Sequence, residues 1–512
     1  MEFTNTIWSL LPPFIAILLA LITKEVYSSL FIGIFAGGLL YAGFNLTAAM
    51  EHIFVDGMIG QLSDSWNVGI LVFLVVLGSM VMLMNRAGGS AAFGKWAVSH
   101  VKTKAGAQVA TIVLGMLIFI DDYFNCLTVG SVMRPVTDKH GISREKLAYL
   151  IDATAAPVCI IAPISSWAAA VTGFVDGANG LSLFIRAIPY NFYALLTLVM
   201  MFAITYMNFD YGSMNLAELN HRAQLKERKK KDAASLTGAE DQPHPPVSEK
   251  GKVSHLVFPI LSLIVCCVIG MIYTGGFFDG ANFIEAFSNS DASVGLVYGS
   301  VVALILTIIN YLITRVLSFS ECMNAIPEGF KSMVPAILVL TFAWTLKSMT
   351  DSLGAAEYVG GIVANIADNN TLMGLLPALV FLVGIFLAFA TGTSWGTFGI
   401  LIPIVVNVFG GDINNELMII AISACMAGAV CGDHCSPISD TTIMASAGAD
   451  CNHIAHVSTQ LPYAFTVAGV SLVSYIFAGI IKNWVASLIF GILLMLGTLF
   501  VIKLLSKRQV KA

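Results

Sequence analysis

Long apolar runs, each close to the length of a bilayer crossing, follow one another along the whole chain. A helix needs about 20 predominantly apolar residues to span the hydrocarbon core. Nine such runs stand out: Ile7–Thr23, Val26–Phe44, Val68–Met84, Phe184–Met207, Val257–Tyr273, Val294–Ile313, Leu372–Ala390, Pro462–Ile481 and Val485–Leu504. The pattern predicts an all-α polytopic membrane protein, because a membrane β-barrel shows short segments of alternating hydrophobicity instead.

Composition strengthens this prediction. Of the 512 residues, 57% are hydrophobic and 11% are charged, and the mean hydropathy is +0.83. A soluble chain carries roughly 25% charged residues. No basic segment precedes the first run, so no cleavable signal peptide is expected. The basic cluster at residues 222–231 lacks interleaved aromatic residues, and nucleic-acid binding is therefore not expected.

One hydrophilic stretch, residues 208–254, divides the chain into two membrane halves. It is rich in Lys, Glu, Pro and Ala and lacks apolar periodicity, which predicts a flexible cytoplasmic linker. Residues 1–207 form the first membrane repeat and residues 255–482 the second. Residues 483–512 add an extra C-terminal helix and a basic tail.

The two halves share weak similarities at polar interruptions. Pro163-Ile164-Ser165-Ser166 aligns without gaps on Pro437-Ile438-Ser439-Asp440. Upstream of these motifs lie the polar stretches Asp121 to Asn125 in the first half and Thr391 to Thr397 in the second. Each stretch is predicted to form the tip of a re-entrant hairpin that enters and leaves the membrane on one side.

Loop charges orient the chain, because Lys and Arg favour cytoplasmic loops. The tail is basic, which places the C-terminus in the cytoplasm and the N-terminus outside; Lys347 and Lys482 fit this rule less well. Counting each hairpin as re-entrant gives about 11 transmembrane helices, with an odd number of spans in the first half. The second repeat is then inverted relative to the first, which is the architecture of secondary transporters.

Ionisable and hydroxyl side chains are most concentrated at residues 431–442, which read Cys-Gly-Asp-His-Cys-Ser-Pro-Ile-Ser-Asp-Thr-Thr. Ionisable groups within a membrane are costly and usually functional. Sodium prefers oxygen ligands, and a buried carboxylate holds either Na⁺ or H⁺. We therefore expect Na⁺ at Asp433, Asp440 and Ser436, with Pro437 removing helical donors from nearby carbonyls. The alternative for Asp440 is that it caps the following half-helix.

Other polar residues are candidate ion or substrate ligands, each with a structural alternative. Hydroxyls in membrane helices often bond between helices, His434 could be held by the backbone rather than relay protons, and one Asp of the 121–122 pair could cap its hairpin. Trp167, Trp344 and Trp395 are expected to pack, with Trp395 also placed to contact an apolar solute. The remaining candidates are Ser439, Thr441, Thr442, His434, Asp121, Asp122, Asn125, Asp152, Ser165, Ser166, Thr393, Ser394 and Thr397.

Residues 432–442 resemble the Gly-Asp-x-x-Ser-Pro-(Leu/Ile)-Ser-Asp-Thr-Thr signature of the NhaC-type Na⁺/H⁺ antiporter family, within the ion transporter superfamily. The resemblance implies a scaffold and a transport subdomain in each half, a homodimer, and a place in the bacterial inner membrane. Members include Na⁺/H⁺ exchangers and a malate/lactate exchanger, and related branches are assigned to amino-acid uptake. The chain departs from the ion-exchanger signature at His434-Cys435.

We therefore expect a secondary active transporter, not an enzyme, that exchanges Na⁺ for H⁺ by alternating access at buried aspartates. The alternative is Na⁺-coupled transport of an amino acid or small organic acid. Na⁺ is the coupling ion, and no cofactor is expected. Gly392-Thr393-Ser394-Trp395-Gly396 matches the nucleophile elbow of serine hydrolases, but that elbow needs a strand before its turn. A passive channel is the third alternative.

The topology predicts that residues 208–254 face the cytoplasm. Trypsin added to intact cells should leave this segment whole, whereas trypsin added to inside-out vesicles should cut it, because its Lys and Arg residues are then accessible. Immunoblotting of a C-terminal tag would detect the fragment. Cleavage in intact cells would contradict the predicted orientation.

Overall fold

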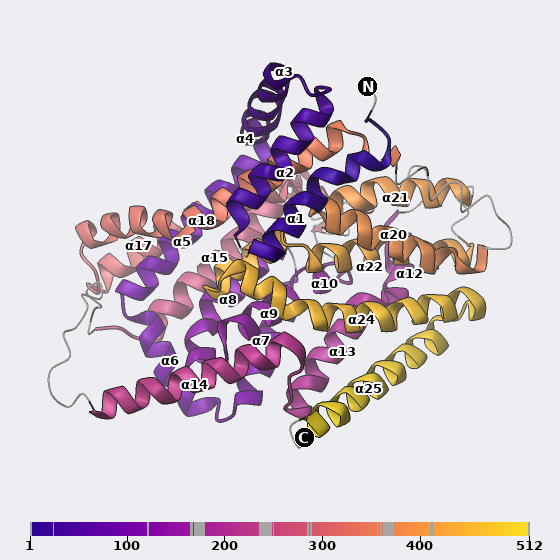
Figure 1. The fold of residues 1–512 in the computed structure, drawn as a ribbon. Coiled ribbons are helices and arrows are strands. Elements are labelled where there is room, and N and C mark those ends of the chain that lie inside the picture. The colour runs from indigo at the N-terminus through magenta and orange to yellow at the C-terminus, as the bar shows by residue number, and fades with distance from the viewer. Residues whose placement is uncertain are drawn as a thin grey trace.

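The computed structural model is helical throughout the part of the chain that it describes (Figure 1). The described residues are 3–23, 25–119, 122–163, 167, 171, 180–234, 248, 250–283, 286, 289–355, 357–358, 361, 373–409 and 414–509. Up to residue 234 the α-helices are α1 (Leu11–Thr23), α2 (Val26–Tyr41), α3 (Leu46–Glu51), α4 (Gly60–Ser63), α5 (Ser65–Arg86), α6 (Gly89–His100), α7 (Lys104–Leu117), α8 (Asp122–Lys139), α9 (Arg144–Asp152), α10 (Ala156–Cys159), α12 (Gly180–Ala187), α13 (Phe192–Met207) and α14 (Gly212–Ala234). From residue 254 they are α15 (Ser254–Thr274), α17 (Ala292–Ile313), α18 (Phe319–Ser352), α20 (Leu376–Thr391), α21 (Ser394–Val408), α22 (Glu416–Cys435), α23 (Asp440–Ala449), α24 (His453–Ile481) and α25 (Trp484–Gln509).

Many of these helices are long and apolar enough to cross a bilayer. Seven of the described helices qualify, and two bent pairs raise the number to nine: Ser182–Tyr190 with Phe192–Met207, at 48°, and Phe319–Val334 with Ile337–Ser352, at 43°. The two N-terminal runs form helices of only 13 and 16 residues, shorter than a full span. The multi-pass membrane fold is confirmed in this form, while the count of about 11 spans and the inverted repeat remain predictions.

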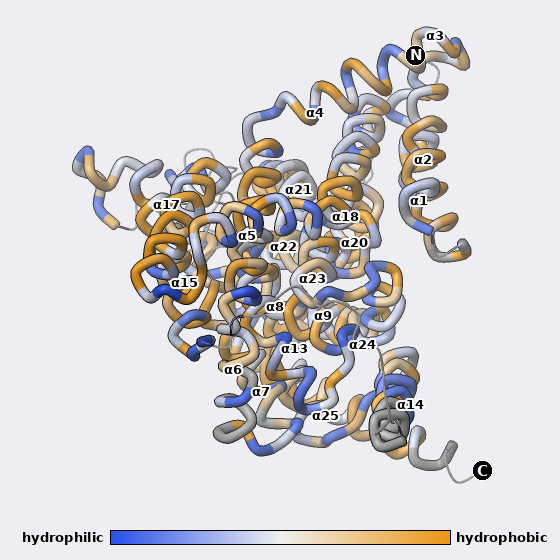
Figure 2. Tube along the Cα trace, turned by 90° about the vertical axis from the view of Figure 1, so that its left-hand side faces the viewer, coloured by the Kyte–Doolittle hydropathy of each residue, from blue (hydrophilic) through white to orange (hydrophobic). Residues whose placement is uncertain are grey.

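Large apolar side chains cover the outer surface of the peripheral spans. Figure 2 shows hydrophobic residues along α15 and α17, where Leu261, Val265, Ile305 and Ile309 are among the exposed side chains. In water such a surface would be a liability, and in a bilayer it is the expected lipid-facing side of a helix bundle.

The ends of the peripheral spans meet in two groups. Near one end of the bundle, Arg86 at the end of α5 donates a hydrogen bond to the Glu321 carbonyl near the start of α18, at 3.1 Å. Near the other, Ser293 Oγ at the start of α17 donates to the Trp66 carbonyl at the start of α5, at 2.8 Å. The loop charges also predict that the end of α5 and the start of α18 lie on one side of the membrane, and the starts of α5 and α17 on the other. Which side faces the cytoplasm remains a prediction.

The predicted polar interruptions coincide with breaks between helices. The turn Gly392–Thr393 separates α20 from α21, and α8 begins at Asp122 after α7 has ended at Leu117. In the second half α22 gives way to α23 across residues 436–439. In the first half α9 ends at Asp152, α10 follows at Ala156–Cys159, and residues 160–163 are again non-helical; residues 164–166 lie outside the described part.

The prediction of a flexible linker across residues 208–254 is wrong for its first part, which forms the 23-residue helix α14. The helix contains four Lys and four Ala residues, which favour helix without an apolar stripe. Tertiary contacts then fix the helix. Met214 is buried, and Glu218, only 2% exposed, accepts a hydrogen bond from the Ser143 backbone N–H at 2.8 Å and pairs with Lys104. Residues 235–247 lie outside the described part.

Removing the Glu218 carboxylate should loosen α14. Glu218→Ala leaves the buried Ser143 N–H without its acceptor, at a cost of about 1–3 kcal/mol. Trypsin should then cut α14 in the purified protein at least ~5-fold faster than in the wild type. Glu227→Ala, at an exposed position on the same helix, is the matched control and should leave the rate unchanged. Equal rates in the two variants would contradict the anchoring role.

Candidate functional site

The break between α22 and α23 lies in the interior of the bundle. Every residue from Leu417 to Cys435 is buried, so the polar residues at the end of α22 are removed from both water and lipid. Ser439 caps α23 by accepting a hydrogen bond from the Thr442 backbone N–H at 3.3 Å. The capping role considered for Asp440 therefore belongs to Ser439, and the Asp440 side chain is directed elsewhere.

The tip of the α20–α21 hairpin contacts this break directly. Gly392 has a φ of +67°, and a Cβ atom there would lie 2.5 Å from the Ile438 carbonyl oxygen. Ser436 Oγ donates to the Phe389 carbonyl at 2.8 Å, and Thr393 caps α21. The hairpin tip and the helix break thus form one unit, whose close approach requires glycine at position 392.

Glycine also brings the backbones of α20 and α22 together. A Cβ atom on Gly432 would lie 2.2 Å from the Ile385 carbonyl oxygen, so no larger residue fits there without displacing a helix. Small residues at such positions are typical of close helix packing in membranes. The contact holds the neighbouring Asp433 at a fixed height beside the hairpin.

Asp433 is the most enclosed carboxylate of the motif, with 4% of its surface exposed. Ser394 Oγ on the hairpin lies 3.0 Å from Asp433 Oδ2, and Thr441 Oγ1 on α23 lies 3.3 Å from the same atom. Asp433 Oδ1 is buried and has no hydrogen-bond partner among the described residues. No Lys or Arg of the described chain forms an ion pair with Asp433, so its charge has no fixed counter-charge there.

The carbonyls near Pro437 have hydrogen-bond donors in the structure. The Asp433 carbonyl accepts from the Ser436 N–H at 2.9 Å, and the His434 carbonyl accepts from Gln460 Nε2 at 2.5 Å. The carbonyl of Pro437 lies 2.7 Å from His453 Nε2. Pro437 does remove the helical i+4 donor from the Asp433 carbonyl, and other donors take its place: a backbone N–H at Asp433, and side chains at His434 and Pro437.

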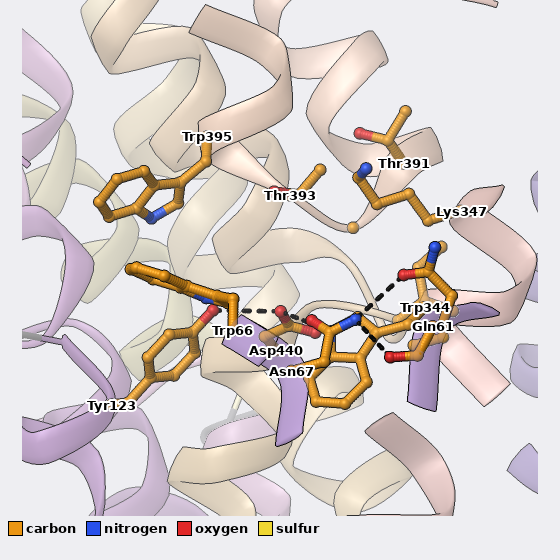
Figure 3. A pocket seen from close by; sticks show the side chains of 13 residues that line it. Gln61, Trp66, Asn67, Tyr123, Trp344, Lys347, Thr391, Thr393, Trp395 and Asp440 are labelled. Atoms are coloured by element: carbon orange, nitrogen blue, oxygen red, sulfur yellow. Dashed lines mark hydrogen bonds between the residues drawn. The ribbon is translucent and has the colours of Figure 1, made fainter. Parts of the chain in front are cut away.

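Asp440 faces a cavity of about 270 Å³ rather than the interior (Figure 3). Its Oδ2 atom accepts hydrogen bonds from Tyr123 Oη and from Trp344 Nε1, both at 3.1 Å. Asp440, Asp433 and Ser436 were expected to share one Na⁺, yet their side chains have three separate sets of partners. The two aspartates thus belong to two different environments.

A second buried polar cluster surrounds Asp152 at the end of α9. His456 Nε2 lies 3.2 Å and Gln460 Nε2 3.0 Å from Asp152 Oδ2, and His434 Nε2 lies 3.9 Å away. Tyr193 Oη lies 2.8 Å from His434 Nδ1. His434 is thus oriented by side chains from other helices, rather than by a backbone hydrogen bond.

Several predicted ligands have structural partners. Asn125 Nδ2 lies within 3.0 Å of the carbonyl oxygens of Gly115, Ile118 and Thr154, which ties the first hairpin together. Thr397 Oγ1 bonds within its own helix to the Thr393 carbonyl at 2.9 Å.

Other candidates also have side-chain or backbone partners. Asp122 accepts from the Trp167 indole at 3.1 Å, and Thr442 Oγ1 lies 3.5 Å from the Asp433 carbonyl. Ser439 Oγ lies 2.9 Å from Thr441 Oγ1. Asp121, Ser165 and Ser166 lie outside the described residues.

The structure adds residues that the sequence reasoning did not select. Trp66, Asn67, Gln61 and Lys347 line the cavity with Asp440, and Gln460 contacts Asp152. Two signals were available: Lys347 violated the expected charge pattern, and His456 with Gln460 forms an i, i+4 polar pair in the apolar α24. Within the described chain, no group of three or more His, Cys, Asp or Glu residues could hold a metal ion.

A multi-pass helical chain with unpaired carboxylates buried at breaks in its helices has the features of a secondary transporter. The sequence model of the Na⁺/H⁺ antiporter family matches residues 170–480, and the chain belongs to this family.

Two of the three relatives below have antiporter names. The chain is 38% identical to an uncharacterized protein of Haemophilus influenzae over 93% of its own length and 92% of the relative. It is 28% identical to the malate-2H(+)/Na(+)-lactate antiporter of Bacillus subtilis over 32% of this chain and 34% of that protein. It is also 31% identical to an uncharacterized Na(+)/H(+) antiporter of Haemophilus influenzae over 28% of this chain and 30% of that one.

The contact at Gly392 yields a direct test of the site geometry. Gly392→Ala places a methyl group against the Ile438 carbonyl at a positive φ, which should destabilise the protein by more than about 1 kcal/mol. Gly469→Ala on α24 is the control, because open space surrounds that position and alanine favours helix. The midpoints of thermal unfolding in detergent should fall for the first variant only. An unchanged midpoint for Gly392→Ala would contradict the close approach.

Proposed function

We propose that this chain exchanges Na⁺ for H⁺ across the membrane, with the two cations competing for Asp433. The observation that carries the proposal is the environment of that carboxylate: buried, bonded to two hydroxyls on one oxygen, and lacking a described partner on the other. An ionised carboxylate in such surroundings is costly unless a cation accompanies it. One H⁺ or one Na⁺ supplies that charge, and binding of either excludes the other.

The oxygens around Asp433 suit sodium. A hydroxyl donates one hydrogen bond and keeps lone pairs for a cation, so Ser394 and Thr441 can stabilise the ionised carboxylate or turn their oxygens toward Na⁺. Na⁺ favours such hard oxygen ligands over nitrogen or sulfur. Asp433 is on α22 and Thr441 on α23, so the ligands come from both sides of the helix break, and Ser394 adds one from the hairpin. Movement of the hairpin relative to α23 would open and close the site, as alternating access requires.

A second candidate function is Na⁺-coupled transport of an amino acid or small organic acid. The cavity beside Asp440 favours it, because exchange of two inorganic cations at Asp433 needs no aromatic-lined space of this size. A homodimer in the bacterial inner membrane, with an external N-terminus and a cytoplasmic C-terminus, completes the proposal.

Asp433→Asn should abolish sodium-driven proton flux. The neutral amide has no charge to be balanced by H⁺ or Na⁺, so it cannot exchange one for the other. The measurement uses purified protein in liposomes that contain a pH dye, with a sodium gradient and no organic solute. Asp351→Asn, an exposed carboxylate near the end of α18, is the control and should keep the wild-type flux. Sodium-driven flux in a correctly folded Asp433→Asn protein would refute the site assignment.

Ser394→Ala should weaken sodium binding without abolishing exchange. One hydroxyl ligand contributes about 0.5–1.5 kcal/mol to the free energy of sodium binding. Its loss should therefore raise the sodium concentration at half-maximal flux about two- to tenfold. The same liposome assay measures this shift. An unchanged sodium concentration at half-maximal flux would show that Ser394, and with it the hairpin, does not contribute to the cation site.

A further inference from the structure

The cavity beside Asp440 has the charges and walls of a site for an organic solute. It lies among the start of α5, the C-terminal part of α18, the hairpin tip and the start of α23 (Figure 3). These include the ends of α5 and α18 that the loop charges place outside the cell. The volume of about 270 Å³ is just below the ~300–1,000 Å³ of typical ligand pockets, which restricts the occupant to a small metabolite.

Part of the cavity lining is suited to an ammonium group. Asp440 Oδ2 accepts two neutral hydrogen bonds, from Tyr123 and Trp344, which hold the carboxylate without neutralising it. The indole rings of Trp66 and Trp395 also line the cavity, with centroids 5.9 Å apart. Indole faces attract cations by about 0.5–2 kcal/mol each, more when water is excluded. A carboxylate beside aromatic faces is a common arrangement for recognising an organic cation.

Lys347 supplies the opposite charge. It lines the same cavity and pairs with Asp351 at 2.9 Å, with the Lys347 and Asp351 side chains 35% and 48% exposed. Exposed i, i+4 pairs contribute only about 0.3–0.5 kcal/mol. The ammonium of Lys347 can therefore leave Asp351 for a solute carboxylate at little cost. The hydroxyls of Thr391 and Thr393, at the hairpin tip, provide further hydrogen-bonding groups along this wall.

We propose that this cavity binds a small zwitterion, an α-amino acid, with its ammonium group against Asp440 and its carboxylate toward Lys347. Among the described lining residues these two carry the only formal charges, one of each sign. A dicarboxylate would meet Asp440 with a repulsive charge, and a diamine would meet Lys347 in the same way. The inference rests on the second candidate function, transport of an organic solute, and does not require exchange at Asp433.

The hairpin tip connects the solute cavity to the cation site. Gly392 and Thr393 line the cavity, and Ser394, the next residue, contacts Asp433. A solute that orders the tip would therefore also order one ligand of Asp433. Sodium should then raise the affinity for the solute, and the solute should raise the affinity for sodium by the same factor.

The test measures binding to the full-length protein in nanodiscs by thermal unfolding and by tryptophan fluorescence. The probes are the protein L-amino acids, first mixed and then singly, followed by the N-acetyl derivative and the decarboxylated amine of each one that binds. Each derivative should bind at least ~10-fold more weakly than its parent, because each lacks one of the two charges. Malate serves as the dicarboxylate probe and should not bind.

Three variants assign the binding to the cavity. Asp440→Asn should weaken binding of the amino acid at least ~10-fold. Lys347→Gln, at the rim, should weaken binding of the amino acid but not of its amine, and it remains informative if Asp440→Asn does not fold. Asp279→Asn, at an exposed carboxylate that is not among the lining residues, is the control and should bind as the wild type does.

The outcomes separate this inference from the exchange proposal. No binding by any amino acid, preference for malate, or unchanged binding in both cavity variants would each overturn the zwitterion site. Sodium-driven proton flux without organic solute, read in liposomes from the same preparation, reports on Asp433 alone. Loss of that flux in Asp433→Asn would leave the exchange proposal intact even if the cavity binds nothing.

Discussion

The uncompensated charge of Asp433 is the constraint on which the centre of this structure depends. A carboxylate that is 4% exposed and has no basic partner in the described chain must be accompanied by a mobile cation or a proton. The surrounding contacts keep it buried. Gly432 lets α22 approach α20 to backbone contact, and Gly392 lets the hairpin tip meet the helix break. A larger residue at either glycine would separate these elements and admit water to the carboxylate.

The two aspartates of the motif, seven residues apart, have different surroundings because the chain changes direction between them. α22 carries Asp433 to the interior, and the break at residues 436–439 turns the chain so that α23 presents Asp440 to the cavity. Hydroxyls suited to a small inorganic cation surround the first, and indole and phenol rings surround the second. One short segment in this way holds its two carboxylates in two different environments, and the hairpin tip contacts both environments.

The polar cluster around Asp152 links the first half of the chain to this centre. Gln460 bonds both Asp152 and the carbonyl of His434, so α9, α22 and α24 are joined through a single side chain. Buried polar networks are stabilising only when most of their members are satisfied, and Asp152 Oδ1 has no partner among the described residues. The cluster therefore holds His434 in place and leaves a buried acceptor, Asp152 Oδ1, near the C-terminal end of α22.

Much of the architecture was predictable from local sequence. Apolar runs longer than about 17 residues commit a chain to the membrane. The breaks at Gly392–Thr393 and at residues 436–439 could be located because glycine, proline and capping hydroxyls act on the backbone within a few residues. The motif also marked Asp433 and Asp440 as the residues of interest, since membrane charge is costly wherever it occurs.

The partners of those residues were decided only by the tertiary structure. Tyr123 reaches Asp440 across 317 positions of the chain, and His456 reaches Asp152 across 304. No local pattern encodes such contacts, because they depend on how packed helices bring distant segments together. The same reason explains why α14 was predicted as a linker. Its sequence is polar, and the contacts of Glu218 with Ser143 and Lys104 that fix the helix appear only in the tertiary structure. Sequence alone therefore determined the membrane class of the chain and two of its helix breaks, whereas packing decided which carboxylate is sealed inside and which one faces a cavity.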